Sequence, residues 1–426
     1  MTRLRRGRRG FALVVVLWVV AIAMLLLYAT IYSAMSEARI TSTRKKLVRA
    51  EALARAGIGR SIVDQRNDLI YDFAEEGESF DGEGDVWMRP EEGKLEEELV
   101  RDGGYFTVET QDLDGLFDLN QMAVATRLPL LKQIFVDIGY NEEDAETAAG
   151  SIIDWVDADT TPTGQESTGE EGVYYAILAA GLEGDRRVDE DAVTPLKMPN
   201  EPFQTVEQLL DVYGVTPEAY FGADSPELEF YLSSEPARRE VGQRFRIENP
   251  PRRGRDEPPI GLRDYFTIGN NGRLNVNTAP KHVLAALVGA NGVSDGESIA
   301  EQTIRKRRGG RVDDFDNKSA YKTAQEVLED GDLAGALQAS APFYAWDIRS
   351  NFARVRSTGY VGDVAFTVTV DTSRGMTNLV RDETFELSDR ARDREDRLGR
   401  RSERRRDQDN ELLVRYPAVR ITRWIE

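Results

Sequence analysis

The sequence has 426 residues, of which 40% are hydrophobic and 31% charged, and its formal net charge is −20. This length suggests two or three domains, and the apolar content is sufficient for packed cores. The negative charge disfavours binding to nucleic acid and to anionic lipid, and it favours cations or basic partner surfaces. The absence of cysteine excludes disulfides, cysteine-ligated zinc and thiol catalysis.

A basic leader precedes a long apolar run at the start of the chain. Residues 11–27 contain neither a charge nor a hydroxyl group, and the run through Ser33 reaches the ~20 residues that a helix needs to cross a bilayer. The leader carries Arg3, Arg5, Arg6, Arg8 and Arg9. The positive-inside bias therefore predicts a cytoplasmic N-terminus, with everything after the run outside. No proline occurs between residues 36 and 65, so we expect the helix to continue beyond the membrane.

Three interpretations of this run compete. A cleaved secretory signal has a shorter apolar core and small residues at its cleavage site, and the region around Thr30 matches that pattern weakly. A plain membrane anchor fits the length. The third interpretation rests on the junction between Gly10 and Phe11, where the basic leader ends in glycine and the apolar run begins with phenylalanine. This junction resembles the type IV prepilin signal, in which the peptidase cuts after the glycine.

The rest of the chain alternates between strand and helix patterns. Residues 75–98 are acidic and glycine-rich, which suggests a surface loop or a short helix. Residues 105–109 predict a strand, residues 119–341 are predominantly helical, and the alternation in residues 363–371 and 419–422 predicts late strands. One strand before the helical block and several after it indicate a helical domain inserted into a sheet domain.

Capping signals predict four helices within this block. Asn141 begins the first and Thr205 begins the second with a capping box. Thr278 precedes the third, predicted over residues 279–288. Ser294 or Asp295 precedes the fourth, which ends at Gly309 and Gly310.

Four motifs indicate which family of pilin-like proteins the chain resembles. Residues 11–18 read FALVVVLW, and DLNQMA, IIDWVDAD and LNVNTAP follow at residues 118–123, 152–159 and 274–280. They resemble the K pseudopilin of type II secretion, the general secretion pathway protein K family. Most pilins and pseudopilins have glutamate at the fifth mature position, whereas Val15 stands there in this chain, as the K family allows.

The resemblance implies an α+β, type IV pilin-like fold. A long N-terminal helix would pack on an antiparallel sheet, and a large all-α domain with helix-hairpin-helix or SAM-like units would be inserted. The expected divisions are a prepilin leader at 1–10, a long helix at 11–68 with its transmembrane part at 11–33, the start of the pseudopilin domain at 69–118, the inserted domain at 119–341, and the remaining strands at 342–426 with a disordered charged loop at 389–409.

The resemblance also implies the function. The chain would be a non-enzymatic minor pseudopilin that supports protein export, at the tip of the periplasmic pseudopilus with minor pseudopilins I and J. It would be a single-pass protein of the inner membrane with its bulk in the periplasm. Prepilin peptidase would cut between Gly10 and Phe11, and the new amine of Phe11 would be methylated.

An acidic loop follows Trp155 and suggests a structural calcium site. Calcium prefers six to eight hard oxygen ligands from flexible loops, and an ion would stabilise a periplasmic domain that has no disulfide. The candidate ligands are Asp157, Asp159, Glu166, Glu170 and Glu171. A merely solvated acidic loop is the alternative.

Nucleic-acid binding and catalysis are two further hypotheses, and the sequence supports them less. Residues 274–310 resemble a helix-hairpin-helix of DNA-uptake proteins, with a basic patch at residues 305–311, so the alternative function is a membrane-tethered nucleic-acid-binding protein. The net charge opposes phosphate binding, and cations at a helix C-terminus are also favoured by the helix dipole. The single histidine, His282, is expected to be a packing or surface residue, and the sequence contains no nucleotide-binding loop.

Overall fold

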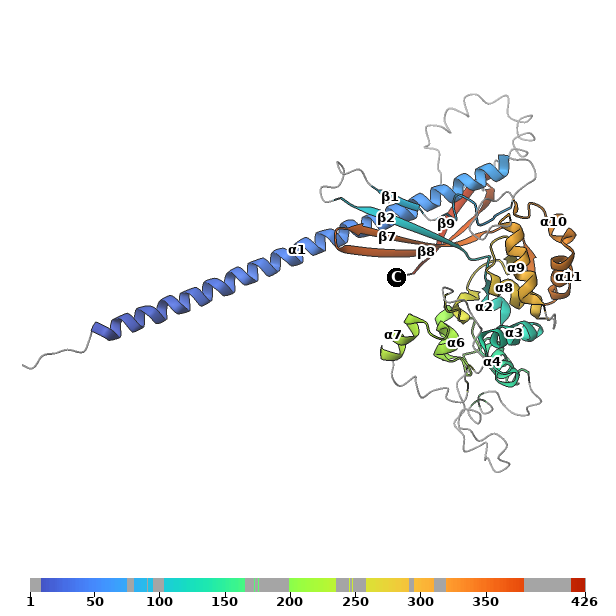
Figure 1. Cartoon of the computed structure of the whole chain (residues 1–426), viewed down its shortest axis with the longest axis horizontal. Helices are drawn as coiled ribbons and strands as arrows, with labels where there is room; N and C mark the ends of the chain where they lie inside the picture. Colours follow the sequence, from blue (N-terminus) through green and yellow to red (C-terminus); the bar gives the residue numbers. More distant parts are fainter. Residues whose placement is uncertain are drawn as a thin grey trace, which may run out of the picture.

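The computed structural model describes residues 9–74, 80–89, 91–94, 103–164, 172, 175, 199–234, 245, 247, 258–290, 295–309, 319–378 and 415–425. Its longest element is α1, one helix of 66 residues from Arg9 to Ala74. The first half of α1 extends alone and its second half lies along a sheet (Figure 1). The apolar stretch has a mean hydropathy of 2.8 and none of it is buried within the chain. Among the described helices, α1 is the one long and apolar enough to cross a membrane.

The sheet has five antiparallel strands in the order β1-β2-β7-β8-β9. They are β1 (Glu91–Lys94), β2 (Tyr105–Asp112), β7 (Phe352–Val361), β8 (Val364–Asn378) and β9 (Arg415–Ile425). The three predicted strands correspond to β2, β8 and β9, each longer than predicted. A long helix on an antiparallel sheet confirms the predicted pilin-like α+β class. The expected disordered loop at 389–409 lies outside the described residues.

Small residues allow α1 to approach the sheet closely. A Cβ atom on Gly359 of β7 would lie 2.0 Å from the carbonyl oxygen of Ala50, and one on Gly57 would lie 2.9 Å from Phe106. The apolar core between the helix and the sheet consists of Ala50, Leu53, Ile58, Phe106, Val108, Val355, Val361 and Val370. The helix is therefore fixed to the sheet by close backbone contact as well as by apolar burial.

A helical insert separates β2 from β7 in the sequence and lies at the end of the sheet away from the free part of α1 (Figure 1). Its helices are α2 (Leu119–Met122), η1 (Ala125–Arg127), α3 (Leu128–Ile138), α4 (Glu142–Asp154), η3 (Val206–Asp211), α6 (Pro217–Phe221), α7 (Pro226–Ser234), η5 (Leu262–Asp264), α8 (Lys281–Gly289), α9 (Gly296–Arg307), α10 (Ala324–Glu329) and α11 (Gly331–Ser340). Helix α3 packs on α4 and α8 packs on α9, consistent with helix-hairpin units. The insert has its own core, separate from the core under α1.

Two short parallel strand pairs add to this helical insert. Strand β3 (Phe117–Asp118) pairs with β4 (Phe266–Thr267), and β5 (Arg273–Asn275) pairs with β6 (Ala345–Asp347). They were not predicted, because two or three residues are too few for a period of two to be visible. The motif LNVNTAP begins in β5, so part of it lies at the boundary between insert and sheet.

The capping predictions have mixed outcomes. Asn141 caps α4, accepting a hydrogen bond from Asp144 N at 2.9 Å, as predicted. Thr205 begins an element through a capping box, but η3 is a 3₁₀ helix. The prediction for Thr278 is wrong, because α8 begins after Pro280 and the Thr278 hydroxyl bonds elsewhere. The fourth helix, α9, begins after Asp295.

Candidate functional site

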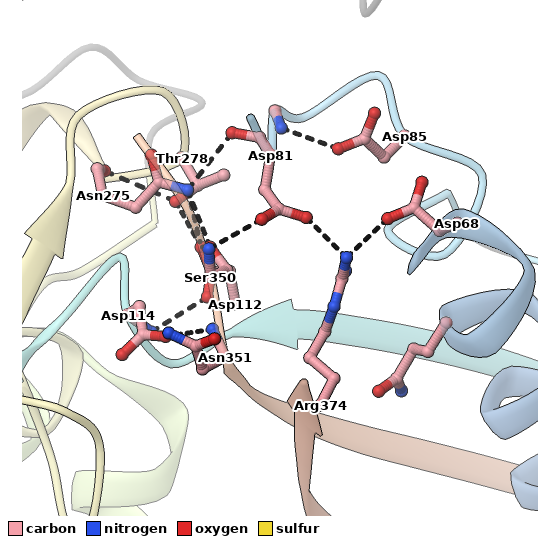
Figure 2. A network of polar contacts seen from close by, with 12 residues as sticks. Asp68, Asp81, Asp85, Asp112, Asp114, Asn275, Thr278, Ser350, Asn351 and Arg374 are labelled. Carbon is pink, nitrogen blue, oxygen red and sulfur yellow. Dashed lines mark hydrogen bonds and ion pairs between the residues drawn. The ribbon is translucent and has the colours of Figure 1, made fainter. Parts of the chain in front are cut away.

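Five carboxylates and one arginine lie where the helical insert joins the sheet (Figure 2). This junction network consists of Asp68, Asp81, Asp85, Asp112, Asp114 and Arg374. Asp112 ends β2, Asp68 lies on α1 and Arg374 on β8, so the network joins the main elements of the pilin-like domain. Asp81 and Asp85 come from residues 80–89, the segment that follows α1.

Asp112 is buried and links β2 to the insert. Its Oδ2 accepts hydrogen bonds from the hydroxyl of Thr278, at 2.5 Å, and from the hydroxyl of Ser350. Its Oδ1 accepts from Asp114 N at 2.9 Å. Asn275 donates to Ser350 Oγ at 2.7 Å. The motif LNVNTAP therefore supplies donors that hold the start and end of the insert together, a role that its sequence alone did not indicate.

Asp114 lies two residues further on and binds the returning chain. Its Oδ2 accepts from Asn351 N at 2.5 Å and from Phe352 N at 3.1 Å. Its Oδ1 is buried without a hydrogen-bond partner in the part of the chain that the structure describes. Burial, and then the neighbouring Asp112, raise the pKa of the Asp114 carboxyl to about 8, although backbone N–H groups lower it. Burial also raises the pKa of Asp112. The pair therefore favours holding a proton at neutral pH.

Asp81 connects the junction to α1 and β8. One oxygen accepts from Ser350 N at 2.7 Å, and the other lies 2.7 Å from Arg374 Nη2. The same arginine nitrogen is 2.5 Å from Asp68, and the guanidinium stacks on Trp87, 4.3 Å from its ring centroid. Both Asp81 and Trp87 are buried. The expectation that residues 75–98 form a surface loop is therefore wrong for residues 80–89.

Glu83 attaches the same segment to the helical insert. It pairs with Arg307 at 2.5 Å and with Arg308 at 2.6 Å. The buried Arg307 also donates to Val276 O at 2.8 Å. The C-terminal end of α9 is thus fixed to residues 80–89, and these residues hold α1, the sheet and the insert in one arrangement.

Asp68, Asp81 and Asp85 also form a compact acidic group. One oxygen from each lies within 4.8 Å of the others, and no other group of three or more metal-binding side chains is this compact among the described residues. Burial is the largest cause that raises the pKa of Asp68 to about 6 and that of Asp85 to about 8. Arg374 already supplies a positive charge to this group. The arrangement can retain a proton or accept a cation.

The predicted calcium loop is described only in part. Glu166, Glu170 and Glu171 lie outside the described residues. Asp159 Oδ1 accepts from Thr161 N at 2.7 Å, whereas Asp157 Oδ1 is buried with no hydrogen-bond partner among the described residues. Burial, and then its acidic neighbours Asp154 and Asp159, raise the pKa of Asp157 to about 6. An unpartnered buried carboxylate oxygen beside other acids fits a hard cation.

Asp154 stabilises the start of this loop. It accepts a hydrogen bond from Thr163 N at 3.0 Å and another from the hydroxyl of Tyr175 at 2.5 Å. A Cβ atom on Gly150 would lie 2.4 Å from Thr163 O, so the loop returns against α4 where only glycine fits. Within IIDWVDAD, Asp154 therefore holds the loop against α4, whereas Asp157 has an oxygen that could bind a cation.

The remaining candidate residues occupy separate parts of the molecule. Gly10 and Phe11 lie within the first turns of α1, and the structure does not test their cleavage. His282 is half-buried, with its ring against Tyr265 and Nε2 2.9 Å from Asp264 O, in keeping with a packing residue.

Comparison with known proteins finds a family that is similar to part of this chain. A family model described as type II secretion system (T2SS), protein K, matches residues 112–222. The type II secretion system protein K of Pseudomonas aeruginosa is 26% identical over 220 residues, covering 50% of this chain and 64% of the relative, which is less than two thirds of its length. Through these residues the chain is similar to the type II secretion system protein K family. The region matched by the family model starts at Asp112, in the junction network.

A solved structure is also similar to this chain. It is the GspK-GspI-GspJ complex from the enterotoxigenic Escherichia coli type 2 secretion system, with 15% sequence identity and a TM-score of 0.47. The alignment covers 79% of this chain and 94% of the chain in that structure.

Proposed function

We propose that this protein is a protein K of a type II secretion system, a minor pseudopilin that acts as a non-enzymatic structural subunit at the tip of the periplasmic pseudopilus. It assembles there with minor pseudopilins I and J and supports protein export across the outer membrane. The observation that carries this proposal is the continuity of α1, which is both the apolar stretch and the helix on which the sheet packs.

The position of the insert supports a place at the tip. The insert lies at the end of the sheet opposite the free part of α1, so it points away from the membrane when the apolar stretch is inserted (Figure 1). Its bulk would interfere with helical repetition along a shaft. The junction network fixes it to the sheet, so it would move with α1 as one body.

The N-terminal junction supports processing by prepilin peptidase. Cleavage between Gly10 and Phe11 on the cytoplasmic face would leave the apolar stretch in the mature protein, with the bulk in the periplasm. Mass spectrometry of the membrane-extracted chain is expected to find a methylated N-terminal Phe11. A mature chain that begins at Met1, or near Thr30, would contradict this assignment.

Calcium is the proposed structural ion. Asp157 and Asp159 would supply charged oxygens, with Glu166, Glu170 and Glu171 as further candidates. Calcium would order the loop by neutralising the repulsion among these acids. The unpartnered buried oxygen of Asp157 supports this assignment.

The alternative function, nucleic-acid binding, receives no support from the described cations of α9. Arg307 and Arg308 both pair with Glu83. Arg305 pairs with Glu301 at 2.5 Å, and Lys306 pairs with Asp330 at 2.7 Å. The four described cations of the basic patch are therefore each paired within the chain, and Arg307 and Arg308 attach the insert to residues 80–89, whereas Arg311 lies outside the described residues.

Complex formation tests the proposal directly. The full chain, co-expressed with minor pseudopilins I and J and extracted in detergent, is expected to co-purify with both, and the mass of the complex should correspond to all three chains. Deleting the gene should abolish export, and the wild-type chain should restore it. A chain that purifies alone, and whose deletion leaves export unchanged, would refute the proposed function.

A further inference from the structure

The part of α1 between the apolar stretch and the sheet carries a concentration of positive charge. Five cations occur within residues 36–49, against a single acid, Glu37. They are Arg39, Arg44, Lys45, Lys46 and Arg49. All are exposed except Lys46, which is half-buried. This local excess contrasts with the net charge of −20 for the whole chain.

Three of these cations have no partner in the described part of the chain. Arg39, Arg44 and Lys45 make neither an ion pair nor a hydrogen bond through their side chains with any described residue. Further along the same helix, Arg55 pairs with Glu51 at 2.7 Å and Arg60 pairs with Asp64 at 2.9 Å. Arg39, Arg44 and Lys45 together form the α1 collar.

Helix geometry places the α1 collar close to the end of the apolar stretch. At 1.5 Å per residue, Arg39 lies about 9 Å beyond Ser33, and Arg44 and Lys45 lie about 17 Å beyond it. At 100° per residue the three side chains point in different directions around the helix axis. Arg39 lies within about one Debye length of the end of the apolar stretch, so screening leaves much of its attraction to anionic groups, whereas Arg44 and Lys45 lie about two Debye lengths away and depend more on the reach of their long side chains.

The sheet begins immediately after the α1 collar. Lys46 pairs with Asp363, in the turn between β7 and β8, at 2.7 Å. This contact fixes the near end of the sheet directly beyond the three unpaired cations. Cations are also depleted on the translocated side of membrane anchors, so a concentration of them there calls for a local role.

We propose that the α1 collar binds the phosphate groups of anionic phospholipids on the membrane face that carries the folded domain. Each bound headgroup opposes sinking or tilting of α1, and the sheet is thereby held at a fixed height above the membrane before assembly. The inference rests on the proposed insertion of α1 into the membrane. Lipid is favoured over a protein partner because the unpaired cations surround the helix instead of marking one docking face.

Amide hydrogen exchange in nanodiscs tests the inference. The full chain is reconstituted into nanodiscs of phosphatidylcholine alone or with one third phosphatidylglycerol, and exchange is followed by mass spectrometry. Residues 36–48 are expected to gain protection in the anionic nanodiscs, by about fivefold for each cation that binds. High salt should remove the gain, and soluble phosphate at the same concentration should not produce it.

Matched variants separate the α1 collar from other cations of the helix. The triple variant Arg39→Gln/Arg44→Gln/Lys45→Gln is expected to lose the gain in protection. The control Arg55→Gln/Arg60→Gln, on the part of α1 beside the sheet, is expected to retain it. Equal loss in both would show that general charge is responsible and would overturn the assignment to the collar.

Two further outcomes distinguish failure of this inference from failure of the proposed function. Protection of residues 13–33 in both lipids, with residues 36–48 unaffected by anionic lipid, would refute lipid binding and leave the membrane anchor intact. Lack of protection at residues 13–33 would refute the anchor as well. Protection of residues 36–48 only when minor pseudopilins I and J are added would show a protein-docking surface and would also overturn the inference.

Discussion

Asp114 offers a stringent test of the junction network, because its neutral analogue should stabilise the protein. The Asp114 side chain is fully buried, its Oδ2 accepts two backbone hydrogen bonds, and its Oδ1 has no partner among the described residues. Asparagine has the shape of the protonated acid and can keep both bonds to the remaining oxygen. We therefore expect Asp114→Asn to raise the free energy of unfolding at neutral and alkaline pH.

The expected magnitude follows from proton linkage. The pKa of Asp114 is raised to about 8 in the folded protein, first by burial and then by Asp112, whereas an unfolded aspartate has a pKa of about 3.9. Between these values the folded state holds one more proton, so stability decreases as pH rises, by about 1.4 kcal/mol per pH unit. The stability contributed by the bound proton of Asp114 is fully present below about pH 4 and is lost by about pH 8. From pH 5 to pH 7 the wild type should lose about 3 kcal/mol through this group.

The assay is urea unfolding of the detergent-solubilised full chain at several pH values, followed by tryptophan fluorescence. Trp87 stacks on Arg374 in the junction network and reports its disruption. Wild type and Asp114→Asn should have similar stability below pH 4, and the variant should be more stable by about 1.5 kcal/mol at pH 5 and by about 4 kcal/mol at pH 7. Urea is preferred because guanidinium salt screens charges.

Asp112 provides the contrasting control. Both of its oxygens accept hydrogen bonds from the chain, so Asp112→Asn places an amide donor against existing donors. We expect this variant to lose about 1–3 kcal/mol, including at low pH. If Asp114→Asn instead lowers stability equally at pH 5 and pH 7, Asp114 is ionised in the folded protein and the reasoning about its proton is refuted.

Three other predictions concern the anchor, the calcium loop and the helix–sheet contact. Val15→Glu should reduce secretion, because an unpaired charge in the bilayer costs about 3 kcal/mol by insertion scales; unchanged secretion would show that Val15 is incidental. Millimolar calcium should raise the melting temperature relative to EDTA, and Asp157→Ala should diminish the rise; no rise in the wild type would leave only a solvated loop. Gly359→Ala should cost about 1–3 kcal/mol, because its Cβ would meet the carbonyl of Ala50, whereas Gly335→Ala, with open space around its Cβ, should cost nothing; equal effects would contradict the close-approach argument.

Local sequence patterns were sufficient to predict the elements that depend on local interactions. The apolar run and the absence of proline from residues 36–65 predicted one long helix, because helix propensity and periodicity are determined within a few turns. Asn141 was recognisable because a helix cap bonds three residues along the chain. The alternation of β8 and β9 was visible because each strand has one face toward the helix and the other away from it.

The junction network could not be predicted in the same way, because its partners are far apart in the sequence. Asp81 and Glu83 lie among glycines and acids, a composition typical of solvated loops. Their ion pairs are with Arg374 and Arg307, which are more than 200 residues away and resemble ordinary surface arginines in the sequence. The clearest available signal was Trp87, a large aromatic residue within an otherwise polar segment.

The neighbouring positions of β2 and β7 have a consequence for how this protein can be altered. Asp112 is opposite Ala353 across the strand pair, and Leu113 N–H donates to Phe352 O at 3.0 Å. The insert is thus an enlarged hairpin loop, and each doubling in the length of a flexible loop costs only about 0.6 kcal/mol in closure. A short designed turn from Asp112 to Phe352 would keep the register of every strand of the main sheet. The helical insert can therefore be exchanged or shortened while α1 and the main sheet keep their arrangement.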